Sequence, residues 1–150
     1  MNTGPQGEHP VTELGTGLDL VRLQVLVAQG DPLPAAALTP TLTGHAVEAR
    51  LNAEDVPAGY LPATGTVVRF EVPEGTRVDS AVASGSVVGT HYDAMLAKVI
   101  VHADTREQAC AQLAEALRRS RTHGVTTNRA LPYRDLQSGA SPSGPRATGP

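Results

Sequence analysis

Four side chains that can take part in catalysis fall within the first nine residues. Asn2, Gln6, Glu8 and His9 are separated there by glycines and a proline, in the stretch MNTGPQGEHPVTE. This composition is typical of a polar catalytic loop, in which ionisable side chains exchange protons with a substrate. An adjacent Glu and His are nevertheless more often a solvated loop pair. A catalytic loop also needs rigid elements on both sides, so its place at the start of a chain is unexpected.

Composition and charge do not favour several classes of function. The chain has 150 residues, enough for one ordinary domain. Its formal net charge of -3 gives no general reason to bind nucleic acid or an anionic membrane surface. Cys110 is the single cysteine, which predicts a small buried side chain in a reducing compartment. Because no signal segment follows Met1 and the most apolar stretch, LDLVRLQVLVA, is too short to span a bilayer, we expect a cytoplasmic protein.

A helix is predicted over residues 18–29. Leu18, Val21, Val25 and Ala28 recur at helical spacing, and Gly30 supplies a stop. Further leucines lie off this stripe, so we expect the helix to be buried on more than one side. The following stretch, GDPLPAAALTPTLTG, is rich in proline and predicts a connecting loop.

Alternating and continuous apolar runs predict an antiparallel sheet. HAVEARLN turns Val47, Ala49 and Leu51 to one face and its charges outward. TVVRFEV is expected to turn Val68, Phe70 and Val72 inward and to form a hairpin with TRVDSAV. AMLAKVIV predicts a central strand covered on both faces. Its Lys98 is expected to reach solvent or to pair with a carboxylate such as Asp93.

The clearest helix follows residue 104. Thr105 and Gln108 fit a capping box, and Gly124 is expected to end the helix. The predicted buried stripe comprises Ala109, Leu113, Ala116 and Leu117. The closing SGASPSGPRATGP has almost nothing to bury and predicts a disordered tail. These elements predict an α+β fold, a small antiparallel sheet with flanking helices placed on one face.

Five stretches in one order carry a resemblance to a known family. They are MNTGPQGEHPVTELGTGLDLV, GHAVEARLNAED, YLPATGTVVRFEVPEGTRVDS, HYDAMLAKVIV and THGVTTN. Together they resemble the C-terminal part of biotin carboxylase, the ATP-grasp component of acetyl-, propionyl- and other acyl-CoA carboxylases, from Met1 to about residue 131. The resemblance implies residues 1–17 as the remnant of an active-site loop, 18–136 as the C-terminal domain and 137–150 as a tail. Pyruvate and urea carboxylases share this domain, so the parent enzyme and its acyl-CoA specificity stay open.

The resemblance also implies an activity. The family uses ATP and Mg²⁺ to activate bicarbonate and transfers the carboxyl group to biotin, which a carboxyl carrier holds in the parent enzyme; acetyl-CoA carboxylase serves fatty acid biosynthesis. By position, Glu8 matches the general base and Arg77 the arginine that stabilises the biotin enolate. Gln6 matches a bicarbonate ligand, and Asn2 lies beside the metal and phosphate site. No metal ligand and no cofactor bound by the chain alone are predicted.

The same loop departs from the family pattern Met-Asn-Thr-Arg-x-Gln-Val-Glu-His-Pro. Gly4 occupies the arginine position, Pro5 follows it, and Gly7 replaces the valine. Together with the missing ATP-grasp portion, this predicts a fragment that is inactive on its own and carboxylates biotin poorly. Two alternatives remain: a non-catalytic module that pairs with itself or with a full-length carboxylase subunit, since this region contributes to the family's dimer, and a degenerate gene product without a selected role.

Overall fold

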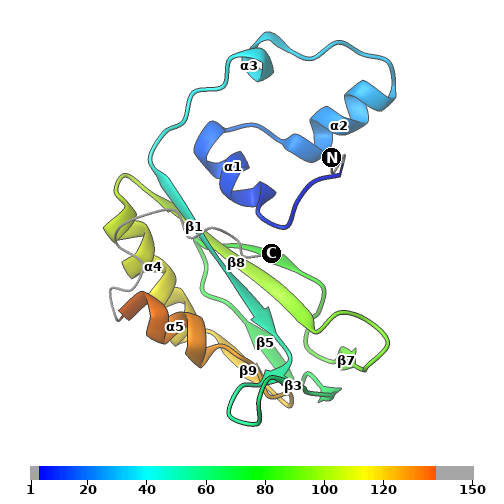
Figure 1. Cartoon of the computed structure of the whole chain (residues 1–150), viewed down its shortest axis with the longest axis vertical. Coiled ribbons are helices and arrows are strands. Elements are labelled where there is room, and N and C mark those ends of the chain that lie inside the picture. The colour runs from blue at the N-terminus through cyan, green and yellow to red at the C-terminus, as the bar shows by residue number, and fades with distance from the viewer. Residues whose placement is uncertain (1–3, 138–150) are drawn as a thin grey trace.

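A three-stranded antiparallel sheet forms the centre of the molecule, in a computed structural model that describes residues 4–137. Its strands are β1 (His45–Asn52), β8 (Met95–Ala103) and β6 (Arg77–Ser80), in the order β1-β8-β6 (Figure 1). The long helix α4 (Arg106–Arg119) packs on one face of this sheet and the short helix α1 (His9–Thr16) on the other. The predicted α+β fold with flanking helices is confirmed. The expectation that the helices share one face was wrong, because both faces of the sheet need cover.

The remaining elements are short. Three further helices are α2 (Leu20–Ala28), α3 (Ala35–Leu38) and α5 (Ala130–Gln137). Three two-stranded sheets pair β2 (Glu54–Asp55) with β3 (Leu61–Pro62), β4 (Gly65–Thr66) with β7 (Val87–Val88), and β5 (Arg69–Glu71) with β9 (Arg121–His123). Residues 138–150, which contain nearly all of the predicted tail, lie outside the described residues, as does Asn2.

Strand β8 is the central strand that its apolar run predicts. Every residue from Leu96 to Val101 is buried, including Lys98. Because successive side chains of a strand point to opposite faces, Val99 and Val101 pack against α4 while Lys98 and Ile100 face α1. The strand therefore separates an apolar layer from a layer that contains charged groups.

Helix α4 completes the apolar layer. The predicted capping box is present, with Thr105 accepting from the amide of Gln108 and the Gln108 side chain accepting from the amide of Thr105. The predicted stripe of Ala109, Leu113, Ala116 and Leu117 is buried and packs against β1 and β8. The expected stop at Gly124 was wrong, because the helix ends at Arg119 and β9 follows before the glycine is reached.

The predicted hairpin between TVVRFEV and TRVDSAV does not form. Strand β5 pairs with β9 instead, and β6 pairs with the free edge of β8. Phe70 and Val72 pack against the core as predicted, whereas Val68 is 69% exposed and its neighbour Val67 is fully buried. The pairing was missed because the long apolar strand β8 offers two edges, and local alternation does not show which segment takes the second.

Helix α2 is far more exposed than its composition predicts. It has no buried residue, and Val21, Val25 and Val27 are each about half exposed. The helix forms where the 3.6-residue period indicates, with Asp19 capping it by accepting from the amide of Arg22 at 2.8 Å. It lies with α3 away from the sheet (Figure 1), whose two faces α4 and α1 already cover. The expectation of burial on more than one side was therefore wrong.

Gly124 gives the first test of this packing. Its φ is +96°, and a β-carbon there would collide with the carbonyl oxygen of Thr66 and lie 2.9 Å from the amide nitrogen of Val68. We expect Gly124→Ala to lower the free energy of unfolding by about 3 kcal/mol or more, because backbone must move in addition to the left-handed strain of roughly 1–2 kcal/mol. Urea denaturation measures this loss.

Gly75→Ala is the matched control for Gly124→Ala. Gly75 also has a positive φ, +80°, but a β-carbon at this position would meet no heavy atom within 4 Å. Gly75→Ala should therefore lower the free energy of unfolding by the left-handed strain alone. An equal loss in Gly75→Ala and Gly124→Ala would contradict the packing argument.

Candidate active site

Charged side chains of both signs cover the sheet face beneath α1. In one row across the sheet, Arg50 of β1 pairs in register with Lys98 of β8, which pairs with Asp79 of β6. In the next row, Ile100 lies between Glu48 and Arg77. The alternation of HAVEARLN predicts that Glu48 and Arg50 share a face. Because α1 covers that face, however, the Glu48 side chain is only 7% exposed rather than turned to solvent.

Glu8 lies against Arg50. One carboxylate oxygen of Glu8 accepts from Nη2 of Arg50 at 2.8 Å, and Nε of Arg50 lies 3.5 Å from Glu48. Glu8 stands at the N-terminus of α1, with Pro10 in the first turn, where a proline needs no amide partner. A β-carbon on Gly7 would overlap the Arg50 guanidinium. The glycine therefore leaves room for Arg50 to approach the loop.

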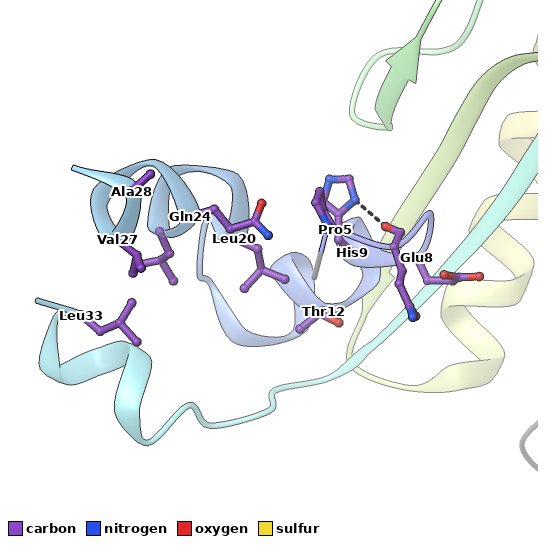
Figure 2. A pocket seen from close by; sticks show the side chains of 12 residues that line it. Pro5, Glu8, His9, Thr12, Leu20, Gln24, Val27, Ala28 and Leu33 are labelled. Carbon is purple, nitrogen blue, oxygen red and sulfur yellow. Dashed lines mark hydrogen bonds between the residues drawn. The ribbon is translucent and has the colours of Figure 1, made fainter. Parts of the chain in front are cut away.

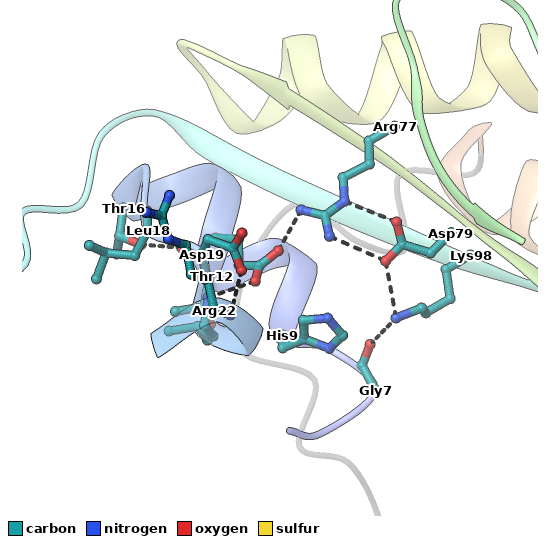
Figure 3. A network of polar contacts seen from close by, with 12 residues as sticks. Gly7, His9, Thr12, Thr16, Leu18, Asp19, Arg22, Arg77, Asp79 and Lys98 are labelled. Atoms are coloured by element: carbon teal, nitrogen blue, oxygen red, sulfur yellow. Dashed lines mark hydrogen bonds and ion pairs between the residues drawn. The ribbon is translucent and has the colours of Figure 1, made fainter. Parts of the chain in front are cut away.

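Lys98 tethers the same loop from the middle of the sheet. Its ammonium group donates to the carbonyl oxygen of Gly7 at 3.2 Å and lies 3.5 Å from Asp79 Oδ2 (Figure 3). Asp93, its expected partner, instead accepts from the amide of Met95 at 2.8 Å. Asp79 takes this place because it is the cross-strand neighbour of Lys98.

Arg77 is held by two carboxylates of the chain. Its Nη1 lies 2.7 Å from Glu13 Oε2, and its Nε donates to Asp79 Oδ1 at 3.0 Å (Figure 3). Glu13 is buried and also accepts from the amide of Leu20 at 2.8 Å. These contacts tie α1, the start of α2 and β6 together. Arg77 is thus an organising group for this face of the sheet, whatever else it binds.

Burial and neighbouring charge shift two carboxyl pKa values in opposite directions. Burial raises the pKa of Glu48, and the charges of Lys98 and Arg50 offset that effect only in part. For Asp79, burial acts upward too, but the hydrogen bonds and positive charges of Arg77 and Lys98 outweigh it, so its pKa is below 3.8. Asp79 is therefore stabilised as an anion, whereas Glu48 is not.

Asp79 should make stability depend on pH. Because its pKa is lower in the folded chain, its contribution is fully present above pH 3.8 and is lost as pH falls through the folded value. Asp79→Asn removes this dependence and leaves Lys98 without its carboxylate, so we expect a loss of about 1–3 kcal/mol at pH 7. Urea unfolding between pH 7 and pH 3 measures both effects.

The exposed Asp31 provides the control for Asp79→Asn. Asp31→Asn should change neither the stability at pH 7 nor its acid dependence, since the Asp31 side chain makes no hydrogen bond or ion pair within residues 4–137. If Asp79→Asn kept the wild-type acid dependence, the ion-pair network would not be the source of it.

Gln6 and Glu8 line a pocket between α1 and α2. The pocket has a volume of about 830 Å³, and its walls include His9, Leu20 and Val27 (Figure 2). The carbonyl oxygen of Gln6 is bonded by both the amide, at 3.0 Å, and Nδ1, at 2.8 Å, of His9, which fixes the turn into α1. Arg77 lines a different pocket, with Glu13 and Arg22. The structure thus brings Gln6 and Glu8 together but not Glu8 and Arg77.

The described residues were also searched for metal-binding groups and for membrane-spanning helices. Within residues 4–137, no group of three His, Cys, Asp or Glu side chains is placed to hold a metal ion. No helix in the same range has the length and apolar character needed to cross a membrane.

Comparison with known proteins identifies the chain as a domain of the biotin-dependent carboxylases. A family model described as the biotin carboxylase C-terminal domain matches residues 48–144. The chain belongs to this family.

Relatives from bacteria and plants match over most of this chain. It is 40% identical to a biotin carboxylase of Allochromatium vinosum, covering 93% of this chain and 31% of that protein. It is 45% identical to the mitochondrial methylcrotonoyl-CoA carboxylase subunit alpha of Glycine max, and the match covers 85% of this chain and 18% of that protein. The chain therefore spans less than a third of the length of these relatives.

A solved structure agrees with the fold. The biotin carboxylase domain of Hydrogenobacter thermophilus 2-oxoglutarate carboxylase superposes with a TM-score of 0.87 at 37% identity, over 91% of this chain and 31% of that one. That protein was solved as a dimer in complex with MgADP, ADP and bicarbonate.

Sequence reasoning missed the importance of Arg50. The alternation of HAVEARLN predicts the face on which Arg50 lies, but the covering of that face by α1 depends on a contact between residues 42 positions apart. Glu13 and Asp79 were missed for the same reason. The sequence contained part of the signal for these contacts. Glu48, Arg50 and Lys98 lie on one face of two predicted strands, and a charged face needs compensating charges when another element covers it.

Proposed function

We propose that this chain supplies one wall of a biotin carboxylase active site, with Glu8 as the base that deprotonates bicarbonate. The observation that carries the proposal is the 2.8 Å contact between Glu8 and Arg50 in a domain of this family. The contact uses Oε1 of Glu8, and Oε2 makes no hydrogen bond within residues 4–137, so it can accept a proton. Gln6 lines the same pocket and can donate to a bicarbonate oxygen.

Arg50 is our candidate for the cation that stabilises negative charge on the ureido oxygen of biotin. A guanidinium stays charged at neutral pH and donates aimed hydrogen bonds, and Arg50 lies beside the proposed base. The sequence-based assignment of this role to Arg77 remains the alternative. It is less favoured because Arg77 lines a different pocket from Glu8, whereas Arg50, which also contacts two carboxylates, lies 2.8 Å from Glu8 itself.

We do not expect the described residues to hold the nucleotide by themselves. They offer no group of three metal-binding side chains, and the family relatives are more than three times as long as the matched region. In this proposal ATP and Mg²⁺ are held by another part of a carboxylase, on the same or another polypeptide. A biotin carboxyl carrier and a second carboxylase subunit are the expected partners.

A chimaera tests the proposal. The chain would replace the region that it matches in the Allochromatium vinosum biotin carboxylase, and bicarbonate-dependent ATP turnover with free biotin would be measured. We expect weak activity that Glu8→Gln abolishes, with Glu54→Gln, a change in a carboxylate of β2 that does not line the Glu8 pocket, as the control. Activity that survives Glu8→Gln unchanged would contradict the role of Glu8.

A second candidate function is that of a non-catalytic pairing module. The apolar side chains exposed on α2 favour it, since a partner would remove Val21, Val25 and Val27 from water. Size-exclusion chromatography with light scattering tests it, on the chain alone and mixed with a biotin carboxylase subunit. A monomer in both experiments would count against this function.

A further inference from the structure

Glu48 is a buried carboxylate beside the arginine that we assign to biotin. Its side chain is only 7% exposed, whereas the side chains of Arg50 and Glu8 are 46% and 49% exposed. Glu48 and Arg50 alternate with Ala49 on β1, so both point to the sheet face that α1 covers. Burial raises the pKa of Glu48 more than the positive charges of Lys98 and Arg50 lower it. The chain thus keeps a carboxyl group where its charge is costly.

The contacts of Glu48 within residues 4–137 do not explain its place by stability. Its Oε1 lies 3.5 Å from Nε of Arg50, and Glu48 makes no other hydrogen bond or ion pair in this range. Its Oε2 is buried without a hydrogen bond. A buried acceptor without a partner lowers stability, and an apolar side chain of similar volume would avoid that cost. Such a group in a folded protein calls for another explanation.

Two carboxylates share the Arg50 guanidinium. Nη2 of Arg50 donates to Glu8 Oε1 at 2.8 Å, while Nε is directed to Glu48. The guanidinium is planar and rigid, so fixing Nε and Nη2 also fixes the direction of Nη1. Nη1 makes no hydrogen bond within residues 4–137. The two carboxylates therefore aim a third nitrogen that no group of the described chain uses.

We propose that Glu48 is a positioning residue, which holds the Arg50 guanidinium so that Nη1 can donate to the ureido oxygen of biotin. This inference rests on the function proposed above for Arg50. Glu8 alone does not fix the guanidinium, because it lies in a loop and is half exposed, whereas Glu48 is buried in the central sheet. A contact of 3.5 Å fits this role, since catalytic hydrogen bonds are often long without substrate and tighten in the complex.

The variant Glu48→Met separates positioning from support of the fold. Methionine has nearly the volume of glutamate but no acceptor for Nε, and Arg50 is half exposed and keeps Glu8 as its partner. Replacing a buried ionic group by an apolar one is often neutral or stabilising. We therefore expect Glu48→Met to melt at the same temperature as the unmodified chain, or higher, although Arg50 is no longer held.

The Nε–H signal of Arg50 in ¹H–¹⁵N NMR spectra tests the contact on the chain alone. Its absence in Arg50→Gln identifies the signal. We expect Glu48→Met to speed exchange of this proton with water by about threefold or more, because one hydrogen bond is lost. Glu48→Gln should retain most of the protection, since its amide oxygen still accepts. The control is Glu54→Met, which removes a carboxylate of β2 that contacts no arginine within residues 4–137. An unchanged Arg50 signal in Glu48→Met would overturn the proposal.

Kinetics in the chimaera test the consequence for catalysis, with Gly4→Arg added to raise the rate. We expect Glu48→Met to lower kcat by about 10–100-fold with KM for ATP unchanged, the effect of misplacing a catalytic group by about 1 Å. Glu48→Gln should recover most of this loss. When Arg50→Gln is already present, Glu48→Met should change kcat by less than about threefold, because the group that Glu48 positions is gone.

The outcomes distinguish this inference from the proposed function. A chimaera that requires Glu8 but keeps its kcat in Glu48→Met would overturn the role of Glu48 alone. Activity that ignores Glu8→Gln would overturn the proposed function, and the Arg50 signal would still decide whether Glu48 holds the guanidinium. If Glu48→Met melted at a lower temperature and lost kcat equally with and without Arg50→Gln, Glu48 would only support the fold, and the proposal would be wrong.

Discussion

Restoring an arginine at position 4 is expected to raise biotin carboxylation by about thirty- to several-thousand-fold in the chimaera described above. Gly4 occupies the position where the family pattern has arginine. Truncating one partner of a charge-assisted contact in a closed site costs about 2–5 kcal/mol. Each 1.36 kcal/mol of barrier height is a factor of ten in rate. The measurement is kcat/KM for bicarbonate in Gly4→Arg against the unmodified chimaera.

Gly89→Arg controls for the added charge. Gly89 is exposed and has no left-handed φ, and the nearest atom to a β-carbon there is 4.0 Å away, so the change should be tolerated without affecting the rate. If Gly4→Arg raised the rate no more than Gly89→Arg, the loss of arginine at position 4 would not be what limits catalysis in this chain.

Several hydrogen bonds hold the loop that follows Gly4. Glycine adds backbone freedom, so Gly4 and Gly7 alone would not fix this loop. In the structure, Lys98 bonds the carbonyl oxygen of Gly7, Arg50 bonds Glu8, and His9 bonds the carbonyl oxygen of Gln6. The scaffold that an arginine at position 4 would need is therefore present.

Elements with a strong local period were predictable, and their partners were not. The bounds of β1, the central position of β8 and the capping box of α4 follow from spacing within each segment. The pairing of β5 with β9, the exposure of α2 and the contact of Lys98 with Asp79 depend on which segment covers which face. A single sequence does not encode that choice in any local pattern.

The candidate site divides in the same way. The motif that contains Gln6 and Glu8 indicates a catalytic loop, and the structure places both residues on one pocket. The cation beside Glu8 comes from a strand 42 residues further along the chain, and the sequence contains several arginines at exposed or strand positions. Choosing among them required the sheet register, which aligns Arg50 with Lys98 and Arg77 with Ile100.

The two arginines can be separated by kinetics. In the Gly4→Arg chimaera, Arg50→Gln is expected to lower kcat by about 10²–10³, the usual effect of removing one donor that stabilises developing negative charge, with KM for ATP unchanged. Arg77→Gln should lower kcat by less than tenfold and instead lower the thermal stability, because Glu13 and Asp79 lose their partner.

Arg50→Lys distinguishes charge from geometry at the site. Lysine keeps the positive charge but not the planar fork that reaches both Glu8 and Glu48, so an intermediate kcat is expected. A loss of kcat in Arg77→Gln as large as that in Arg50→Gln would transfer the enolate-stabilising role to Arg77. In that case the ion pairs of Arg77 with Glu13 and Asp79 would have to open during the reaction, because they occupy the donors that the substrate needs.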